Sequence, residues 1–150
     1  MRRLIFKNVA RGRLTEPPPA PDEAALAELA ANLGRVARKK LGRSLAIREV
    51  DAGSCNACEL EIHALNNALY NIEGLGIKFV ASPRHADMLL VTGPVARNMQ
   101  LALKRTYEAT PDPKLVVAVG DCGCTGGIFG ESYASAGRVS NVIPVDVAVP

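Results

Sequence analysis

The sequence predicts an α/β domain in which a mostly parallel β-sheet carries helices on both faces. Three observations lead to this fold class. From Ser44 onward, short apolar runs typical of buried strands alternate with segments that have the periodicity of helices, which favours parallel pairing. The chain of 150 residues is long enough for one domain with a substantial core. Its 48% apolar and 22% charged residues are typical of a globular protein.

The composition argues against several classes of protein. Only 4% of the residues are aromatic and tryptophan is absent, so stacking platforms for nucleic acid are unsupported and we expect no nucleic-acid partner. The sequence has no run of about 18 apolar residues that could span a membrane, and its start lacks the apolar stretch of a secretory signal. We therefore expect a cytoplasmic protein, in which the four cysteines are metal ligands or redox groups rather than disulfide partners.

Residues 1–43 are predicted to form a basic N-terminal arm followed by an amphipathic helix. Much of the positive charge behind the net value of +3 lies in this part of the chain. Five cations surround a small apolar cluster near its start: Arg2, Arg3, Lys7, Arg11 and Arg13. The prolines between Pro17 and Pro21 then favour an extended spacer. The arm is either a solvated tail or a segment that docks on a partner or an acidic membrane surface.

The helix of this N-terminal part is expected from about Asp22 to Leu41. One apolar stripe runs along it, formed by Leu26, Leu29, Leu33 and Val36. Acidic residues lie towards its start and basic residues towards its end, which suits the helix dipole, and Gly42 ends it. Because the rest of the helix is rich in alanine, we expect it to pack on another subunit.

Residues 44–150 are predicted to form the α/β domain. Its strands are expected at Leu45–Val50, Ile77–Ala81, Asp87–Val91, Leu115–Val119 and Val142–Val149, the last interrupted at Pro144. Its helices are expected at Leu60–Ile72 and Arg97–Ala109. All four cysteines fall in two loops, Cys55 and Cys58 after the first strand and Cys122 and Cys124 after the fourth. Parallel sheets bind ligands at the carboxyl ends of their strands, so both loops should open on one edge, about 10 Å apart if one strand lies between them.

Four kinds of site compete for these two loops. A C-x-x-C pair alone is shared by thioredoxin-like redox sites, zinc sites and iron–sulfur sites. A redox pair would not need a second cysteine loop, and zinc would favour a second C-x-x-C pair or suitably spaced histidines, unlike His63 and His85. The glycine-rich run from Gly120 to Gly127 could cradle a phosphate, but it lacks the lysine of a P-loop. An iron–sulfur cluster fits best, since thiolates bind it and the N–H groups of glycine loops can hydrogen-bond its sulfides.

Several motifs stand in order along this domain. They are Gly53-Ser54-Cys55-Asn56-Ala57-Cys58-Glu59-Leu60-Glu61-Ile62, Ser82-Pro83-Arg84-His85-Ala86-Asp87, Thr92-Gly93-Pro94, and Gly120-Asp121-Cys122 with Gly126-Gly127. Together they resemble the small electron-transfer subunit of membrane-bound, energy-converting nickel–iron hydrogenases of the hydrogenase-4 and formate hydrogenlyase type. That group is related to the 20-kDa (B) subunit of NADH–quinone oxidoreductase. The resemblance covers residues 44–150, and residues 1–43 resemble the group's variable N-terminal arm.

The resemblance implies a flavodoxin-like domain that carries one [4Fe–4S] cluster and transfers electrons without catalysing a reaction on its own. By position, Cys55, Cys58 and Cys122 would be the cluster ligands. The implied partners are a hydrogenase or 49-kDa-type large subunit, a ferredoxin-like iron–sulfur subunit and membrane-arm subunits, at the cytoplasmic face of the membrane. The two residues between Cys55 and Cys58 favour the hydrogenase branch, because respiratory B subunits usually have adjacent cysteines there. A quinone-reducing complex I-type B subunit and a non-redox assembly module with structural zinc are the alternatives.

The resemblance also bears on residues beside the thiols. It implies a fourth ligand from a Gly-Cys-Pro-Pro segment that would follow Pro150, so we expect the domain to be truncated at its C-terminal end. Cys124 is the candidate that could replace this thiolate. Glu59, next to Cys58, is a candidate for proton transfer near the large subunit's metal site. His63, one turn beyond Glu59, is expected to be a packing or interface residue rather than a ligand.

Overall fold

In this computed structural model, the described part of the chain contains a five-stranded sheet in which all neighbouring strands are parallel. The structure describes residues 7, 10 and 22–150, apart from the side chains of Glu23, Leu26 and Arg38. The strands are β1 (Leu45–Asp51), β2 (Ile77–Phe79), β3 (Met88–Thr92), β4 (Leu115–Val119) and β5 (Val147–Val149). Their spatial order, β2-β1-β3-β4-β5, is the flavodoxin-like order, so the predicted fold class is confirmed.

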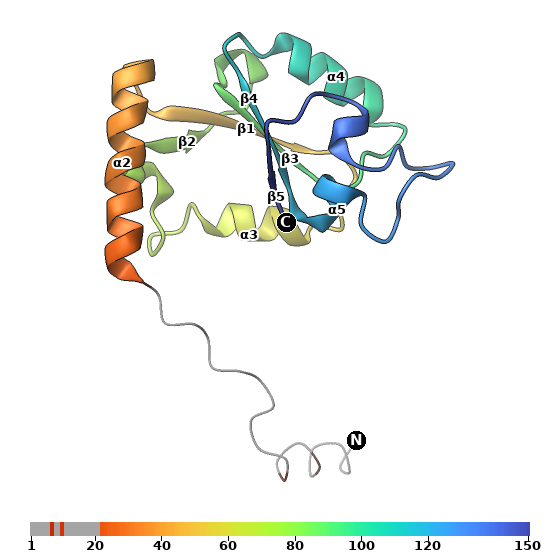
Figure 1. The fold of residues 1–150 in the computed structure, drawn as a ribbon, viewed down its shortest axis with the longest axis horizontal. Helices are drawn as coiled ribbons and strands as arrows, with labels where there is room; N and C mark the ends of the chain where they lie inside the picture. Colours follow the sequence, from red (N-terminus) through yellow and green to blue (C-terminus); the bar gives the residue numbers. More distant parts are fainter. Residues whose placement is uncertain (1–6, 8–9, 11–21) are drawn as a thin grey trace.

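Helices lie on both faces of this sheet (Figure 1). α3 (Ala57–Ala64) covers one face and α4 (Gln100–Ala109) the other, while α5 (Gly120–Thr125) follows directly on β4. Short 3-10 helices in the described residues are η1 (Ile72–Leu75), η2 (Pro83–His85) and η3 (Val139–Asn141). α2 (Glu23–Leu41) stands at the opposite end of the sheet from α5, beside the residues where β1 and β4 begin.

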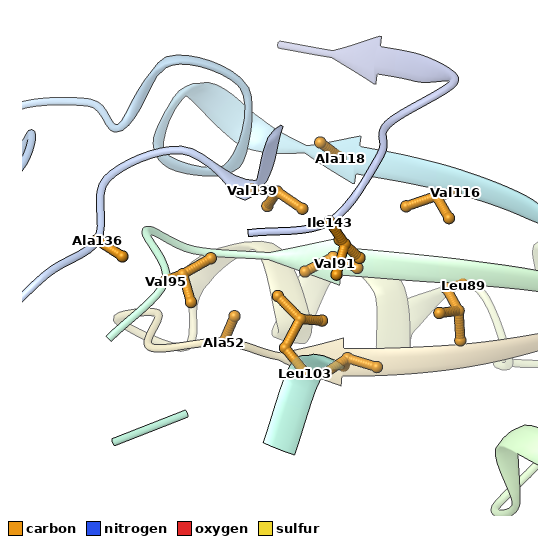
Figure 2. Packing of buried hydrophobic residues seen from close by; sticks show 11 residues of the cluster. Ala52, Leu89, Val91, Val95, Leu103, Val116, Ala118, Ala136, Val139 and Ile143 are labelled. Carbon is orange, nitrogen blue, oxygen red and sulfur yellow. The ribbon is translucent and has the colours of Figure 1, made fainter. Parts of the chain in front are cut away.

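The main core lies between the sheet and α4. Its buried side chains are Val50, Ala52, Leu89, Val91, Val95, Leu103, Val116, Ala118, Ala136, Val139 and Ile143. Figure 2 shows these side chains gathered beside the central strands, with Leu103 reaching in from α4. Each large apolar side chain buried in this way contributes about 1.5–3 kcal/mol relative to leaving it exposed. This layer therefore stabilises the arrangement of the three central strands β1, β3 and β4.

The carboxyl ends of these three strands lie level with one another. Asp51 of β1 pairs with Thr92 of β3, and Thr92 pairs with Val119 of β4. The N–H of Ala52 continues the pairing by donating to the Thr92 carbonyl oxygen at 3.1 Å. The loops after β1 and β4 therefore emerge at one edge of the sheet, on either side of β3, as the sequence predicts. We call this the carboxyl edge.

The predicted helix Leu60–Ile72 is wrong at both ends, since α3 covers Ala57–Ala64. The asparagines beyond α3 bind the backbone instead of continuing the helix. The Asn67 side chain accepts hydrogen bonds from the N–H groups two and three residues further on. Asn71 adopts a left-handed φ of 45°, and its side chain caps η1. Asparagine favours turns over helix for this reason.

The remaining predicted elements are confirmed: β4 covers the predicted Leu115–Val119, and the others have shifted ends. β2 and β5 are shorter than the sequence predicts, the latter because the N–H groups of Val142 and Ile143 bond back to the Val139 carbonyl oxygen instead of pairing with β4. α4 begins at Gln100 rather than at Arg97. The residues before it make a short antiparallel contact instead, in which Val95 and Arg97 hydrogen-bond to residues 134–137.

α2 confirms the predicted helix Asp22–Leu41 to within one residue. Its apolar stripe is only partly covered, because Leu29 is 67% and Val36 50% exposed, whereas Ala37 is buried. The side chain of Leu26 and, apart from positions 7 and 10, the basic arm of residues 1–21 lie outside the described residues, so the arm stays a prediction. Among the described residues, no helix combines the length and the hydropathy needed to cross a bilayer.

Candidate metal centre

The loop after β1 is shaped by one carboxylate. Asp51 Oδ1 accepts hydrogen bonds from the N–H groups of Ser54 and Gly53, at 3.0 and 2.9 Å. These bonds favour the charged form and hold the pKa of Asp51 below its ordinary value of 3.8. The resulting turn leaves Cys55 exposed and places Cys58, which is half buried, in the first turn of α3.

Two glycines let this loop lie directly on the segment that follows β3. A Cβ atom on Gly53 would lie 2.8 Å from the Pro94 carbonyl oxygen, and one on Gly93 would lie 2.7 Å from the Ser54 nitrogen. Both glycines have positive φ, 133° at Gly53 and 73° at Gly93. Because no larger residue fits at either position, the backbone of the first cysteine loop is held against the middle of the carboxyl edge.

The second cysteine loop folds as a short helix rather than an open loop. α5 begins at Gly120, whose φ of 77° turns the chain at the end of β4. The Thr125 hydroxyl donates to the Asp121 carbonyl oxygen at 2.8 Å, which closes the helical turn. Residues two apart on a helix do not share a face, so α5 presents Cys122 and Cys124 in different directions.

Three of the four thiols share one local environment at the carboxyl edge. The Cys58 sulfur lies against Gly120 at the start of α5, so closely that a Cβ atom there would be 2.7 Å away. The pKa of the Cys58 thiol is raised, first by burial and then by Glu59, Cys55 and Cys122. These neighbours act on Cys58 through their charged forms, an effect that falls with distance. Cys55 precedes Cys58 by three residues, and Cys122 follows by two the Gly120 that the Cys58 sulfur touches, so the loops that carry these three thiols meet at the carboxyl edge.

The fourth thiol has a different environment. Cys124 Sγ donates a hydrogen bond to the Ala118 carbonyl oxygen of β4 at 3.5 Å and packs against the main core. Burial is the chief cause that raises the pKa of Cys124. The Val149 backbone opposes this shift, and the charge of Asp121 adds to it. The structure therefore groups three thiols and leaves Cys124 facing β4.

Several buried polar groups lack a hydrogen-bond partner in the described part of the chain, and one of them, Glu59, adjoins Cys58. Glu59 is only 4% exposed, and neither of its carboxylate oxygens has a hydrogen-bond partner in the described part of the chain. Glu49 of β1 has one such oxygen, and its other oxygen lies 3.6 Å from His63 Nε2. Burial raises the pKa of Glu49, with His63 opposing and Glu59 reinforcing this shift. The buried Thr92 hydroxyl, at the end of β3, also lacks a partner among the described residues, so Glu59 beside Cys58 is one of several buried polar groups that remain available to a bound group.

Sequence reasoning singled out the thiols, Glu59 and the motif that begins at Thr92, but it missed Glu49 and the burial of the Thr92 hydroxyl. Glu49 lies within β1 and Thr92 ends β3, and the pairing of these strands is needed to place their side chains. The one available signal is an acidic residue inside a predicted buried strand. Arg84 and His85, by contrast, lie exposed in η2, which precedes β3, so the structure does not bring them to the carboxyl edge.

The chemistry of the donors fits an iron–sulfur cluster. Among the described residues, no three His, Cys, Asp or Glu side chains converge so that they would hold a single metal ion. A cluster places its ligands differently, since each thiolate binds a separate iron around a larger inorganic body. Exposed or half-buried thiols on two glycine-containing turns are the groups that bind such a cluster.

An apolar loop, Ile128–Tyr133, projects from the carboxyl edge next to Cys122. A Cβ atom on Gly127 would lie 2.8 Å from the Cys122 sulfur, and Ile128 directly after it is 94% exposed. Phe129 is exposed as well, and Tyr133 is 98% exposed. Large exposed apolar side chains gathered in one place are typical of a surface that another molecule covers. Sequence reasoning missed this loop, because apolar residues give no sign of their exposure.

The apolar loop is braced by polar contacts at its base. The Arg97 guanidinium donates to the Ser132 carbonyl oxygen at 3.1 Å. The Asn141 side chain donates to Glu131 Oε1 at 2.7 Å and to the Ala136 carbonyl oxygen at 2.8 Å. The exposed side chains are therefore carried on a loop whose backbone is held in place.

A parallel sheet of flavodoxin-like order with three thiols at its carboxyl edge defines a class of α/β protein that binds a group where its strands end. Comparison with known families identifies which one. The family described as "NADH ubiquinone oxidoreductase, 20 Kd subunit" matches residues 55–150, and the chain belongs to this family. The resemblance predicted from the motifs is thereby confirmed, and the chain belongs with the subunits of oxidoreductase and hydrogenase complexes.

Individual relatives agree with this assignment. The chain is 42% identical over 134 residues to formate hydrogenlyase subunit 7 of Escherichia coli (strain K12), covering 89% of this chain and 51% of the relative. It is 48% identical over 112 residues to a probable membrane-bound hydrogenase subunit of Pyrococcus furiosus, covering 75% of this chain and 67% of the relative. The chain thus spans about half the length of the Escherichia coli relative.

A solved structure gives the same picture. A chain in the structure of the membrane-bound sulfane sulfur reductase, an archaeal respiratory membrane complex, is 38% identical to this one with a TM-score of 0.61. The match covers 77% of this chain and 64% of that chain. Fold and sequence therefore point to the same group of proteins.

Proposed function

We propose that this chain carries one [4Fe–4S] cluster and passes electrons singly within a membrane-associated complex of the hydrogenase or NADH–quinone oxidoreductase type. The observation that carries the proposal is the grouping of the Cys55, Cys58 and Cys122 thiols at the carboxyl edge. Family membership and the names of the relatives support the redox role. In this role the chain is an electron-transfer subunit of an enzyme and catalyses no reaction alone.

The residues around the site bind and shield the cluster, which when bound supplies a centre that gains and loses one electron. Cys55, Cys58 and Cys122 would bind it as thiolates. Burial raises the pKa of Cys58, which favours the protonated thiol in the cluster-free protein. Binding of iron as a thiolate therefore releases this proton. The buried Thr92 hydroxyl, at the end of β3, is a donor without a partner among the described residues, and hydrogen bonds from such donors to a cluster's sulfurs tune the reduction potential.

A fourth thiolate is expected from a Gly-Cys-Pro-Pro segment after β5, as the family resemblance implies. β5 pairs with β4 in parallel, with Val149 opposite Val119. Chain that continues beyond β5 would therefore emerge at the carboxyl edge, beside α5. Cys124 is the alternative fourth ligand, and it would have to leave its contact with β4 to reach the other thiols.

We further propose that the carboxyl edge docks on a hydrogenase or 49-kDa-type large subunit. A ferredoxin-like iron–sulfur subunit and membrane-arm subunits complete the complex, on the cytoplasmic face of the membrane. The exposed loop Ile128–Tyr133 beside Cys122 supports this docking, and the relatives are named as parts of membrane-bound assemblies. Electron transfer requires a cluster that is close to its neighbours and shielded from water, and a partner that covers this edge supplies both.

Glu59 is proposed to exchange protons with the metal site of that large subunit. Its carboxylate is buried next to Cys58, and neither oxygen is bound to another described residue. A carboxylate that is not held by other hydrogen bonds can accept and release a proton as its surroundings change.

Anaerobic reconstitution of the chain with iron, sulfide and an excess of a small thiol tests the cluster. We expect a brown protein with broad absorption at about 400 nm and an EPR signal after reduction. Ser substitutions of Cys55, Cys58 and Cys122 should each remove this absorption. Cys124→Ser should retain it, because the Cys124 sulfur faces β4. A colourless protein that binds one zinc ion would favour the assembly module instead.

A further inference from the structure

Two of the three grouped thiols rest against glycines. A Cβ atom on Gly120 would lie 2.7 Å from the Cys58 sulfur, and one on Gly127 would lie 2.8 Å from the Cys122 sulfur. Real Cβ atoms essentially never approach another heavy atom so closely. Neither sulfur could keep its place beside a residue with a side chain, so each occupies the space that a side chain would fill.

The two contacts join different parts of the chain. Gly120 lies at the end of β4 and the start of α5, whereas Cys58 lies on α3, which follows β1. The contact between Gly120 and Cys58 therefore connects the two cysteine loops across β3. Gly127 follows α5 and touches Cys122, where a Cβ atom would also lie 3.3 Å from the Cys122 Cα atom. That second contact acts within one loop and concerns a single thiol.

Backbone conformation alone does not account for this arrangement. Gly120 has a φ of 77° and Gly127 a φ of 55°. Gly76 and Gly130 have almost the same values, 82° and 50°, yet a Cβ atom on either would meet nothing within 4 Å. Each glycine that touches a sulfur thus has a matched glycine with a similar positive φ and no sulfur contact.

We propose that Gly120 and Gly127 are positioning residues for the cluster, which seat the sulfurs of Cys58 and Cys122 in the cluster-free protein. The inference rests on the proposed function for the identity of the ligand, but the seating is a property of the chain itself. A methyl group at Gly120 displaces Cys58 and separates the two cysteine loops. A methyl group at Gly127 displaces Cys122 and leaves the other loop in place.

Four single variants test the seating: Gly120→Ala with its matched Gly76→Ala, and Gly127→Ala with its matched Gly130→Ala. Each pair carries a similar cost for alanine at positive φ, on the order of 1 kcal/mol. Alkylation rates of individual cysteines in the full cluster-free chain, measured by mass spectrometry, are the first readout. Cys58 should react several-fold faster in Gly120→Ala than in Gly76→Ala, and Cys122 several-fold faster in Gly127→Ala than in Gly130→Ala.

Cys124 serves as an internal control for folding, because in the unmodified chain it packs against the main core and bonds to β4. If Gly120→Ala loosens the whole fold, the double variant Cys58→Ala with Gly120→Ala decides the matter. Removing the sulfur makes room for the new methyl group, so this double variant should recover part of the thermal stability that Gly120→Ala alone loses. A double variant that is less stable by the sum of the two single effects would overturn the seating.

Cluster uptake is the second readout. Changes beside metal ligands typically lower affinity by about 10-fold or more, so Gly120→Ala and Gly127→Ala should retain far less iron than their matched variants. Any cluster that remains should show an altered EPR signal. Equal alkylation rates and equal iron content within each pair would overturn the proposal. If the unmodified chain takes up no cluster, the proposed function fails, while the alkylation rates still decide whether the glycines seat the thiols.

Discussion

At the scale of single residues, the carboxylate of Asp51 organises the first cysteine loop. It binds two N–H groups of the turn that leads to Cys55. Asp51→Ala should lower the free energy of unfolding by about 1 kcal/mol, because two hydrogen bonds to a charged group are lost. Cys55 and Cys58 should also become more reactive towards alkylation. Chemical denaturation measures the first effect, and Glu108→Ala on the exposed surface of α4 is a control that should change neither quantity.

The same carboxylate gives a prediction for pH. The pKa of Asp51 is lowered in the folded protein, so its contribution to stability is fully present above the ordinary value of 3.8. The contribution is lost as the pH falls through the lowered pKa. The difference in unfolding free energy between the unmodified chain and Asp51→Ala should therefore be constant near neutral pH and shrink below about pH 4. A difference that grows as the pH falls would contradict the hydrogen bonds seen here.

Glu59 is a second residue whose replacement separates stability from function. Burying a carboxylate without partners costs stability, so Glu59→Gln should raise the free energy of unfolding of the isolated chain by about 1 kcal/mol. If Glu59 transfers protons in the complex, the same change should lower turnover while the cluster can still be reduced. The control is Glu61→Gln, an exposed position on α3, which should leave both properties unchanged. Unchanged turnover in Glu59→Gln would dismiss the proton-transfer role.

At the scale of elements, the three central strands could be predicted closely, whereas β5 and α3 could not. The strand Leu115–Val119 is confirmed at both ends, because a continuous apolar run has few alternatives in a parallel sheet. The end of α3 depends on asparagines such as Asn67, whose side chains compete with the helix for backbone N–H groups. Periodicity does not reveal that competition. The helical form of α5 was missed for a similar reason, since its glycines indicate a loop.

α2 is attached to the rest of the molecule mainly through its buried side, and two neighbouring residues test this attachment. Ala37 is buried and Val36 is half exposed, although they are adjacent on the helix. Ala37→Glu should destabilise the chain by about 1–3 kcal/mol, because the new carboxylate would be buried or would displace α2. Val36→Glu should change the isolated chain little. Thermal unfolding measures the difference, and equal effects of the two changes would show that α2 lies differently on the sheet.

At the scale of the whole molecule, the apolar loop Ile128–Tyr133 should matter only when a partner is present. Ile128→Ser combined with Phe129→Ser should leave the unfolding temperature of the isolated chain nearly unchanged, because both side chains are exposed. In the assembled complex the same variant should bind its partner at least about 10-fold more weakly, as expected when central apolar anchors are removed. Co-purification with the other subunits measures this effect. Leu101→Ser, an exposed leucine on α4, is the matched control.

The thiol site was more predictable than its surroundings. Spacing in the sequence places the cysteines after two strands, and the parallel pairing of the sheet then brings Cys55, Cys58 and Cys122 to one edge. The buried polar groups Glu49 and Thr92 could not be found in the same way. Their role depends on which face of a strand meets α3 and on their lack of hydrogen-bond partners among the described residues. The spacing of residues in the sequence predicts neither property.

The placement of α2 and the thiols at opposite ends of the sheet has a practical consequence for electrochemistry (Figure 1). β1 alone, with seven residues, separates the two ends by roughly 23 Å of extended chain. Exposed amines at Lys39 and Lys40, on the last turn of α2, could anchor the protein to a carboxylated electrode. Molecules immobilised in this orientation would turn the carboxyl edge towards the solution, where soluble electron donors would reach the proposed cluster without passing the electrode surface.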